Sequence, residues 1–481
     1  MSPLASQIAG RLILNCVRRV LPGALVVSFL LSPGAVSAAG AGVDSDGNRT
    51  SRISDDSIPE LDVESFPTRP SPILELGNPF LASGNIRKGI ELPGGAIWQP
   101  SLVVFGTYRN AFQSFRFADE THSEWANRLD LFANLQLSGS ERFLIGFRPL
   151  DEEGRFTSYQ FESGAIGDAS GWNNEINSEV TTAFFEGDLG EMFPTLDTAD
   201  TRNLDLGFAV GRQPLNYQEG LLLNDIVDAI GVTRNTLLPT GGSDLQATFI
   251  YGWDNVHRND NRRGQDQKLY ALVFAADYPS TTLNADFIYI DDQEGRSDGF
   301  FWGLSDVRRI GHYNVSTRLL GSHALKEESP AVSNGNLIFV EVSWTPPWTH
   351  DHVYVNGFVA IDEFASASRD PSSGGPLGRT GILFRNAGLG RSIGALDTRA
   401  TQTIGGALGY QWFISPVRNQ VIFELGMRLD ESERTNRSIG AGVRYRHVFG
   451  QHVLINIDGF TALNSSTENN LGLRAEMRLE F

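Results

Sequence analysis

The sequence ends in Leu471-Gly-Leu-Arg-Ala-Glu-Met-Arg-Leu-Glu-Phe481, and this stretch decides the fold. Its odd positions are apolar, whereas its even positions are Gly, Arg or Glu. Such strict alternation predicts a β-strand with one apolar face and one polar face. About eleven residues let a tilted strand cross a bilayer, while strands of soluble proteins are usually about five or six residues long. The stretch is therefore typical of the closing strand of an outer-membrane β-barrel.

Similar alternating segments recur from Ser101 to the C terminus, with turn-rich breaks between them. The segments that begin near Asp225 and Phe300 are the weakest. A single-chain barrel of this class has an even number of strands, so we predict eighteen, or sixteen if the two weak segments are misread. The segments begin near Leu102, Ala126, Arg142, Asn177, Leu204, Asp225, Leu245, Leu269, Leu283, Phe300, His312, Leu337, Val353, Gln402, Val421, Ile439, Val453 and Leu471.

The lengths of the breaks favour an all-β, transmembrane antiparallel β-barrel with short periplasmic turns and longer extracellular loops. Counting back from Phe481 places every short break, such as 138–141 and 449–452, on the periplasmic side. The longest break, 365–400, contains Ile382-Leu-Phe384, which is unusually apolar for a free outer loop. We therefore expect this segment to fold into the lumen, which would otherwise be aqueous in a barrel of this size.

The N terminus has the features of a signal peptide for general secretion. Basic residues, including Arg18 and Arg19, precede the apolar run 21–31, and Ala35-Val-Ser-Ala38 supplies small residues for cleavage. The proline-rich segment that follows is expected to be a periplasmic extension, either flexible or wrapped around the base of the barrel. The predicted divisions are a signal peptide at 1–38, the extension at 39–97 and the barrel at 98–481.

Composition narrows the possible partners. The chain carries 39 basic and 57 acidic residues, a formal net charge of −18, which argues against nucleic acid as a partner. Its one cysteine, Cys16, lies in the predicted leader. The expected partners are outer-membrane lipid, the barrel assembly machinery and a hydrophilic solute, and the aromatic terminus Phe481 is the expected assembly signal.

Val210-Gly-Arg-Gln-Pro-Leu-Asn-Tyr-Gln-Glu-Gly220 resembles a segment of the alginate-export-like family of outer-membrane barrels. Upstream, Glu179-Val-Thr-Thr-Ala-Phe184 is similar to the strand that precedes that segment in the family. The resemblance implies an eighteen-stranded channel that passes an anionic polysaccharide or another solute. Independently, Gly207, Gly211 and Gly220 are expected to let the backbone bend where a loop enters the barrel.

Arginines on the polar faces of the strands are candidates for lining the pore and binding anions, because guanidinium groups stay charged and bind carboxylates in a fork. Acidic residues such as Glu424, Asp458, Glu476 and Glu480 share these faces, so a ladder of cross-strand ion pairs is the favoured alternative. The candidate arginines are Arg128, Arg148, Arg212, Arg318, Arg428, Arg444, Arg446, Arg474 and Arg478.

We interpret the chain as a passive outer-membrane channel for small or polymeric hydrophilic solutes with a modest preference for anions. We expect no catalytic residue, cofactor or metal. Two alternatives stay open: a scaffold barrel that holds a partner protein, and a membrane-embedded hydrolase with loop carboxylates such as Asp291-Asp292 or Glu327-Glu328. The histidines near predicted periplasmic turns indicate an interfacial belt more than a metal site; they are His350, His352, His447 and His452.

Overall fold

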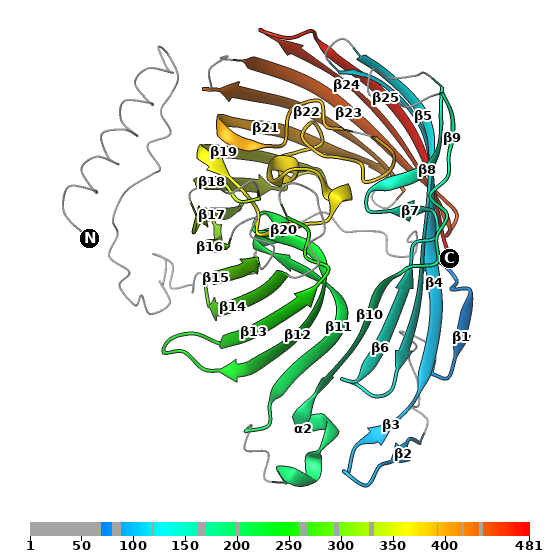
Figure 1. Ribbon diagram of the computed structural model, residues 1–481, viewed down its shortest axis with the longest axis vertical. Coiled ribbons are helices and arrows are strands. Elements are labelled where there is room, and N and C mark those ends of the chain that lie inside the picture. Colours follow the sequence, from blue (N-terminus) through cyan, green and yellow to red (C-terminus); the bar gives the residue numbers. More distant parts are fainter. Residues whose placement is uncertain are drawn as a thin grey trace, which may run out of the picture. The chain divides into compact units, whose positions relative to one another are not determined.

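Eighteen long strands form one closed antiparallel ring within the residues that the structure describes (Figure 1). Each strand pairs with the next along the ring, and β25 returns to β4 with Leu471 opposite Arg116 and Glu480 opposite Thr107. The strands are β4 (Ser101–Phe117), β5 (Glu120–Gln136), β6 (Arg142–Phe147), β10 (Val180–Asp188), β11 (Leu206–Tyr217), β12 (Leu223–Leu237), β13 (Asp244–Asp254), β14 (Gln267–Tyr278), β15 (Thr281–Asp292), β16 (Gly299–Ile310), β17 (Tyr313–Ala324), β18 (Gly335–Trp344), β19 (His352–Phe364), β21 (Ala400–Ser415), β22 (Asn419–Asp430), β23 (Arg437–Phe449), β24 (Val453–Asn464) and β25 (Asn470–Glu480).

The predicted fold class and strand number are confirmed. The two weakest segments are both barrel strands, since Asp225 lies in β12 and Phe300 lies in β16. This computed structural model describes residues 69–78, 88–117, 120–161, 170–198, 203–258, 267–292, 298–326, 331–391, 393–415, 418–431 and 436–481. The predicted signal peptide lies outside the described residues. None of the described helices is long and apolar enough to cross a membrane.

The outer wall carries the apolar half of each alternating pattern. On β22, for example, Phe423, Leu425 and Met427 are 46%, 60% and 47% exposed, while the intervening Glu424 and Gly426 are buried inside. Exposed apolar side chains in this arrangement suit contact with lipid and not with water. The barrel therefore lies in a bacterial outer membrane, as predicted.

The C terminus joins the barrel at Gly106 on β4. The Gly106 amide donates to the Phe481 carbonyl at 2.6 Å, and the Phe481 amide donates back to the Gly106 carbonyl at 3.1 Å. A Cβ atom at position 106 would lie 2.5 Å from the carbonyl oxygen of Asp130 and 2.8 Å from the Phe481 ring. A glycine is thus needed at this position for the terminal residue to complete the seam.

The segment 365–399, called the inner loop below, folds into the barrel as predicted. Leu383 and Phe384, from its apolar triplet, are 1% and 0% exposed. The wall makes room for them with glycines: a Cβ at Gly426 or Gly442 would lie 3.0 Å or 2.8 Å from the Leu383 side chain. The inner loop contains β20 (Ser368–Arg369), which pairs in parallel with β12, and the 3₁₀ turns η4 (Pro371–Ser373) and η5 (Pro376–Arg379).

A second inward element is the turn η3 (Gln218–Gly220) between β11 and β12. The next residue, Leu221, is fully buried and accepts a hydrogen bond from Ser366 of the inner loop at 2.7 Å. Of the three glycines predicted to let the chain bend, Gly211 and Gly220 have φ angles of +124° and +79°, values that favour glycine. Apolar residues of the wall from β12 to β19 form a core with these loops, so much of the lumen is filled.

Short elements extend both ends of the barrel. On the outer side, β7 (Asp151–Glu152), β8 (Arg155–Gln160) and β9 (Gly171–Asn173) follow β6, and β8 pairs with β5 beyond the end of β6. At the opposite end, β1 (Leu74–Leu76) pairs with β4 below the seam. A hairpin of β2 (Ile90–Glu91) and β3 (Ile97–Trp98) contacts the turn that contains α2 (Leu189–Met192) and η2 (Pro194–Leu196), through Gly94 and Thr195.

Candidate functional site

The lumen contains a cavity of about 930 Å³ between the inner loop and the barrel wall. Seven arginines and four carboxylates are among its described lining residues. Some of these arginines belong to strands of the wall and others to the inner loop, so the cluster forms only when the loop folds into the barrel. They are Arg109, Arg128, Arg148, Arg318, Arg369, Arg379 and Arg385, and the acidic residues are Glu219, Asp225, Glu341 and Asp370.

A row of three arginines crosses the seam of the barrel beside this cavity. Arg478 on β25 is the direct partner of Arg109 on β4, and Arg109 is the direct partner of Arg128 on β5. Like charges directly opposite each other on a sheet destabilise it. Glu476 offsets part of this repulsion, since its carboxylate lies 2.6 Å from Arg109 Nε and 4.0 Å from Arg478 Nη2.

Two arginines of the row, Arg109 and Arg128, also hold the inner loop in place. Arg109 donates to the carbonyls of Ala387 and Gly388 at 2.9 and 3.3 Å, and Arg128 donates to the same Gly388 carbonyl at 3.0 Å. On the other side of the loop, the Glu424 carboxylate accepts the backbone N–H groups of Ile382 and Leu383, each at 2.8 Å. The loop is thus fixed by charged groups of the wall as well as by apolar packing.

Arg385 projects from the inner loop into the cavity and has no ion pair with a carboxylate among the described residues. Enclosure within the barrel, followed by repulsion from four surrounding arginines, lowers the pKa of its guanidinium. The side chain remains exposed to the cavity, where an anion can reach it. The surrounding arginines are Arg109, Arg379, Arg444 and Arg478.

Two of the remaining predicted arginines on the last strands, Arg444 and Arg474, form ion pairs, as the favoured alternative held. Arg444 bonds Asp458 across the strands, and Arg474 lies 3.3 Å from the same carboxylate. Arg446 instead donates to the amide oxygen of Asn456 at 3.1 Å. This part of the wall is therefore a mixed-charge ladder with an excess of guanidinium groups towards Arg385.

The expectation that Arg428 lines the pore and binds anions needs correction. Arg428 is 3% exposed, and its guanidinium bonds Asp430 and the carbonyls of Asp397 and Arg399. It anchors the base of the inner loop and does not line the cavity, because the loop covers it.

Two other predicted arginines lie on different parts of the wall. Arg212 binds Asp228 in a fork at 2.8 and 2.9 Å and caps the carbonyl of Val180, outside the cavity. Arg318 does line the cavity, where it bonds Glu341. Arg379 of the inner loop reaches the same Glu341 at 3.0 Å. These guanidinium groups are largely neutralised by their partners.

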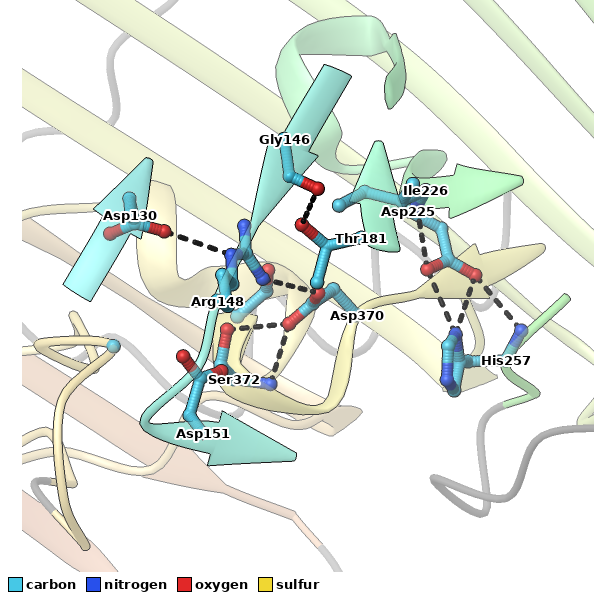
Figure 2. A network of polar contacts seen from close by, with 12 residues as sticks. Asp130, Gly146, Arg148, Asp151, Thr181, Asp225, Ile226, His257, Asp370 and Ser372 are labelled. Atoms are coloured by element: carbon cyan, nitrogen blue, oxygen red, sulfur yellow. Dashed lines mark hydrogen bonds and ion pairs between the residues drawn. The ribbon is translucent and has the colours of Figure 1, made fainter. Parts of the chain in front are cut away.

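The hairpin of β7 and β8, residues 151–160, is called the outer hairpin below. Where it meets the inner loop, carboxylates and arginines form a buried network (Figure 2). Arg148 lies between Asp130 at 2.9 Å and Asp370 at 3.6 Å. Although burial opposes it, hydrogen bonds from Ser372 and the charge of Arg148 hold the pKa of Asp370 below its usual value. Asp151 is 5% exposed, and burial raises the pKa of its carboxyl to about 6.

Asp225 fixes the inner loop through a second buried contact (Figure 2). It accepts hydrogen bonds from His257 Nδ1 at 2.9 Å and from the Ser368 hydroxyl. Although burial opposes it, Asp225 raises the pKa of His257. The serine is bonded to the carboxylate and not to the imidazole, so this Ser/His/Asp set holds the loop and lacks the serine–histidine bond of a hydrolase triad.

Four of the cavity arginines are absent from the candidates predicted from the sequence: Arg109, Arg369, Arg379 and Arg385. Arg109 could have been found, because it lies on the polar face of a long alternating strand like the arginines that were selected. The other three belong to the inner loop, where no periodicity indicates direction. For Arg379 and Arg385, the one available signal was that they lie close to the apolar triplet 382–384 in the sequence.

The histidines near the predicted periplasmic turns do not all lie in one kind of environment. His447 lies 3.9 Å, centroid to centroid, from the Phe449 ring near the periplasmic end of β23, as in an aromatic belt, whereas His352 lines the cavity. The described part of the chain holds no group of three or more His, Cys, Asp or Glu side chains that could bind a metal ion. Glu327 and Glu328 lie outside the described residues.

A closed eighteen-stranded barrel with a loop folded into its lumen is the architecture of outer-membrane porins, and comparison with solved structures shows the same fold. OccK9 (OpdG) of Pseudomonas aeruginosa is similar with a TM-score of 0.53 and 10% identity, over 79% of this chain and 98% of that chain. A BenF-like porin of Pseudomonas fluorescens Pf-5 is similar with a TM-score of 0.53 and 9% identity, over 79% of this chain and 99% of that chain. OccAB3 of Acinetobacter baumannii is similar with a TM-score of 0.52 and 9% identity, over 79% of this chain and 99% of that chain.

These similarities establish the porin fold. They do not single out the alginate-export-like family that the sequence resembles. No protein-family model matches the sequence, and no curated protein matches it.

Proposed function

We propose that the protein is a passive outer-membrane channel for small anionic solutes, above all carboxylates. The observation that carries the proposal is the Arg478–Arg109–Arg128 row together with Arg385, which lines the cavity near this row and has no ion pair among the described residues. Clustered guanidinium groups in a confined, water-containing lumen raise the local concentration of anions and bind carboxylates in a fork. Passage is then diffusion down a gradient.

The size of the cavity favours small solutes. Its volume of about 930 Å³ is typical of a site for one small molecule. The inner loop is held from both sides, by Arg109 and by Glu424, so the cavity does not open freely. Export of alginate, which the sequence resemblance implies, requires a polymer to pass this loop, and it stays a prediction of that resemblance alone.

The porin fold and the basic cavity favour a channel over the two alternatives. A scaffold barrel has no need for arginines whose charges repel one another beside an open cavity. For the hydrolase, the observed Ser368–Asp225–His257 arrangement leaves the serine hydroxyl bonded to the wrong partner for activation.

Citrate block of single channels in planar bilayers tests the proposal. A tricarboxylate should interrupt the chloride current, because it binds the arginines and leaves slowly. Arg385→Gln should shorten the interruptions several-fold. Arg399→Gln, in the same loop but with an 80% exposed side chain paired to Asp397, is the matched control and should not change them. Block that is absent, or equal in both variants, would overturn the proposal.

A further inference from the structure

The arginine-lined cavity has a second wall, on β17–β19, where uncharged polar side chains lie beside the ion pair of Arg318 and Glu341. On β17, Asn314 and Ser316 line it, and on the next strands Ser343 and Asn356 do so. Asn314 is the direct cross-strand partner of Ser343, so amide and hydroxyl groups lie side by side on the lumen face. This wall belongs to β17–β19, whereas the arginine row belongs to β25, β4 and β5, on another side of the ring (Figure 1).

Two of these groups, the Asn314 amide and the Ser343 hydroxyl, are accessible to a solute. Asn314 is exposed, and Ser343 is partly exposed. Ser316 is 8% exposed, and its buried hydroxyl has no hydrogen-bond partner in the described part of the chain. Asn356 donates through Nδ2 to the carbonyl of Thr380 at 2.9 Å, and this bond fixes the amide beside the cavity. A buried hydroxyl without a partner is costly unless something at the site bonds to it.

The described lining contains no Phe or Trp, and its aliphatic side chains, Ile226, Val307, Val315 and Ile382, are outnumbered by polar and charged ones. An alkyl or aromatic carboxylate would therefore leave its apolar part against amide and hydroxyl groups, which would lose hydrogen bonds to water without gaining others. A solute with hydroxyl groups can replace those bonds. A site built to hydrogen-bond hydroxyl groups discriminates strongly against analogues that lack them.

We propose that the uncharged polar side chains of this wall recognise hydroxyl groups, so that the preferred solutes are hydroxylated carboxylates such as sugar acids. The arginines bind the carboxylate while Asn314, Ser316 and Ser343 bond the hydroxyls. This inference rests on the proposed function, because it assigns the second half of the same cavity.

Threonate and butyrate form a suitable pair of probes. Both are four-carbon monocarboxylates with one negative charge, and threonate carries three additional hydroxyl groups. Their permeability ratio follows from the reversal potential of a bilayer with one anion on each side. The native channel should favour threonate several-fold beyond the ratio of free aqueous mobilities. The double variant Asn314→Leu/Ser343→Ala should bring the ratio back to that of the mobilities.

Thr233→Val is the matched control, because it removes a hydroxyl that bonds Thr248 at 2.9 Å outside this cavity, and it should keep the native ratio. Two results would overturn the inference. One is a threonate-to-butyrate permeability ratio of the native channel that does not exceed the ratio of the aqueous mobilities. The other is a double variant whose permeability ratio equals that of the native channel. Chloride over potassium selectivity, measured on the same membranes, separates the two proposals. If the channel selects chloride over potassium but does not prefer threonate, only this inference fails. If the channel does not select chloride over potassium, the proposed function fails.

Discussion

Arg109 on β4 and Arg478 on β25 are direct cross-strand partners at the seam that closes the barrel. Both point to the lumen, and Glu476 is the one carboxylate that contacts both of them among the described residues. A pair of opposed like charges would be a defect if the seam served only to close the barrel. The pair is explained if an anion in the lumen is its regular third partner.

Replacing Arg478 by Gln should weaken anion selectivity without harming the barrel. Arg478 approaches carboxylates only at 3.9 and 4.0 Å and makes none of the bonds that hold the inner loop, so stability should change by less than about 0.5 kcal/mol. The ratio of chloride to potassium permeability should fall about twofold at low salt. Heat-modified migration on a gel checks the fold, and a large loss of folded barrel would contradict this assignment.

Replacing Glu424 by Ala should release the inner loop. The carboxylate accepts two backbone N–H groups, from Ile382 and Leu383, and each buried N–H left without a partner costs about 1–3 kcal/mol. Single-channel conductance should rise and become noisier while the barrel stays folded. Glu424→Gln, which keeps an acceptor oxygen, should have a smaller effect. Equal conductance in the Ala variant and the native channel would show that the loop does not limit the pore.

The Gly106–Phe481 contact should determine assembly more than conduction. Gly106→Val would place side-chain atoms where the Phe481 ring and the Asp130 carbonyl now lie, so it should lower the folded yield in the outer membrane severalfold. Deletion of Phe481 should do the same, because it removes both terminal hydrogen bonds. The channels that do assemble should conduct normally. A native yield for both variants would remove this role.

The contact between the outer hairpin and the inner loop should weaken as pH rises from about 4 to 6. Burial raises the pKa of Asp151 to about 6, so the docked hairpin holds the proton more tightly than a released hairpin does. The protonated form therefore stabilises docking at low pH, by at most about 3 kcal/mol, and this contribution is lost above pH 6. The charged groups that face Asp151 are Arg128, Arg148, Asp130 and Asp370.

Current noise and protease cleavage of the hairpin are the measurements for this prediction. Both should be greater at pH 7 than at pH 4.5 in the native protein. Asp151→Asn keeps the shape of the side chain but removes its titrating carboxyl group. In this variant, the noise and the cleavage at pH 7 should therefore equal those at pH 4.5. A pH difference that persists unchanged in Asp151→Asn would assign the effect to another group.

The barrel could be predicted almost completely from the sequence, because each strand has its own local alternation of apolar and polar residues. Alternation over ten or more residues determines which face of a strand meets lipid, and the positions of the short turns determine which end is periplasmic. Even the segment at Phe300, whose pattern is short, was recovered as the start of β16. The sequence also predicted that the inner loop folds into the lumen, because the apolar triplet Ile382-Leu-Phe384 would be exposed to water in a free extracellular loop.

The candidate site was predicted only in part, because it depends on contacts between distant segments. Alternation placed Arg444 and Arg474 on the inner face, but it could not show that Asp458 neutralises them. Arg385 acquires its role from the docking of the inner loop, which follows from lumen-facing glycines such as Gly426 and from Glu424. Alternation likewise could not show that the same loop covers Arg428.

The reversal potential of the native channel under a tenfold KCl gradient tests the central claim most directly. The arginines at the seam and Arg385 predict chloride selectivity in dilute salt of about 0.1 M. The selectivity should decline towards 1 M, as the Debye length falls from about 10 to about 3 Å and screens the arginines. Potassium selectivity, or a potential that does not depend on the salt concentration, would contradict the account.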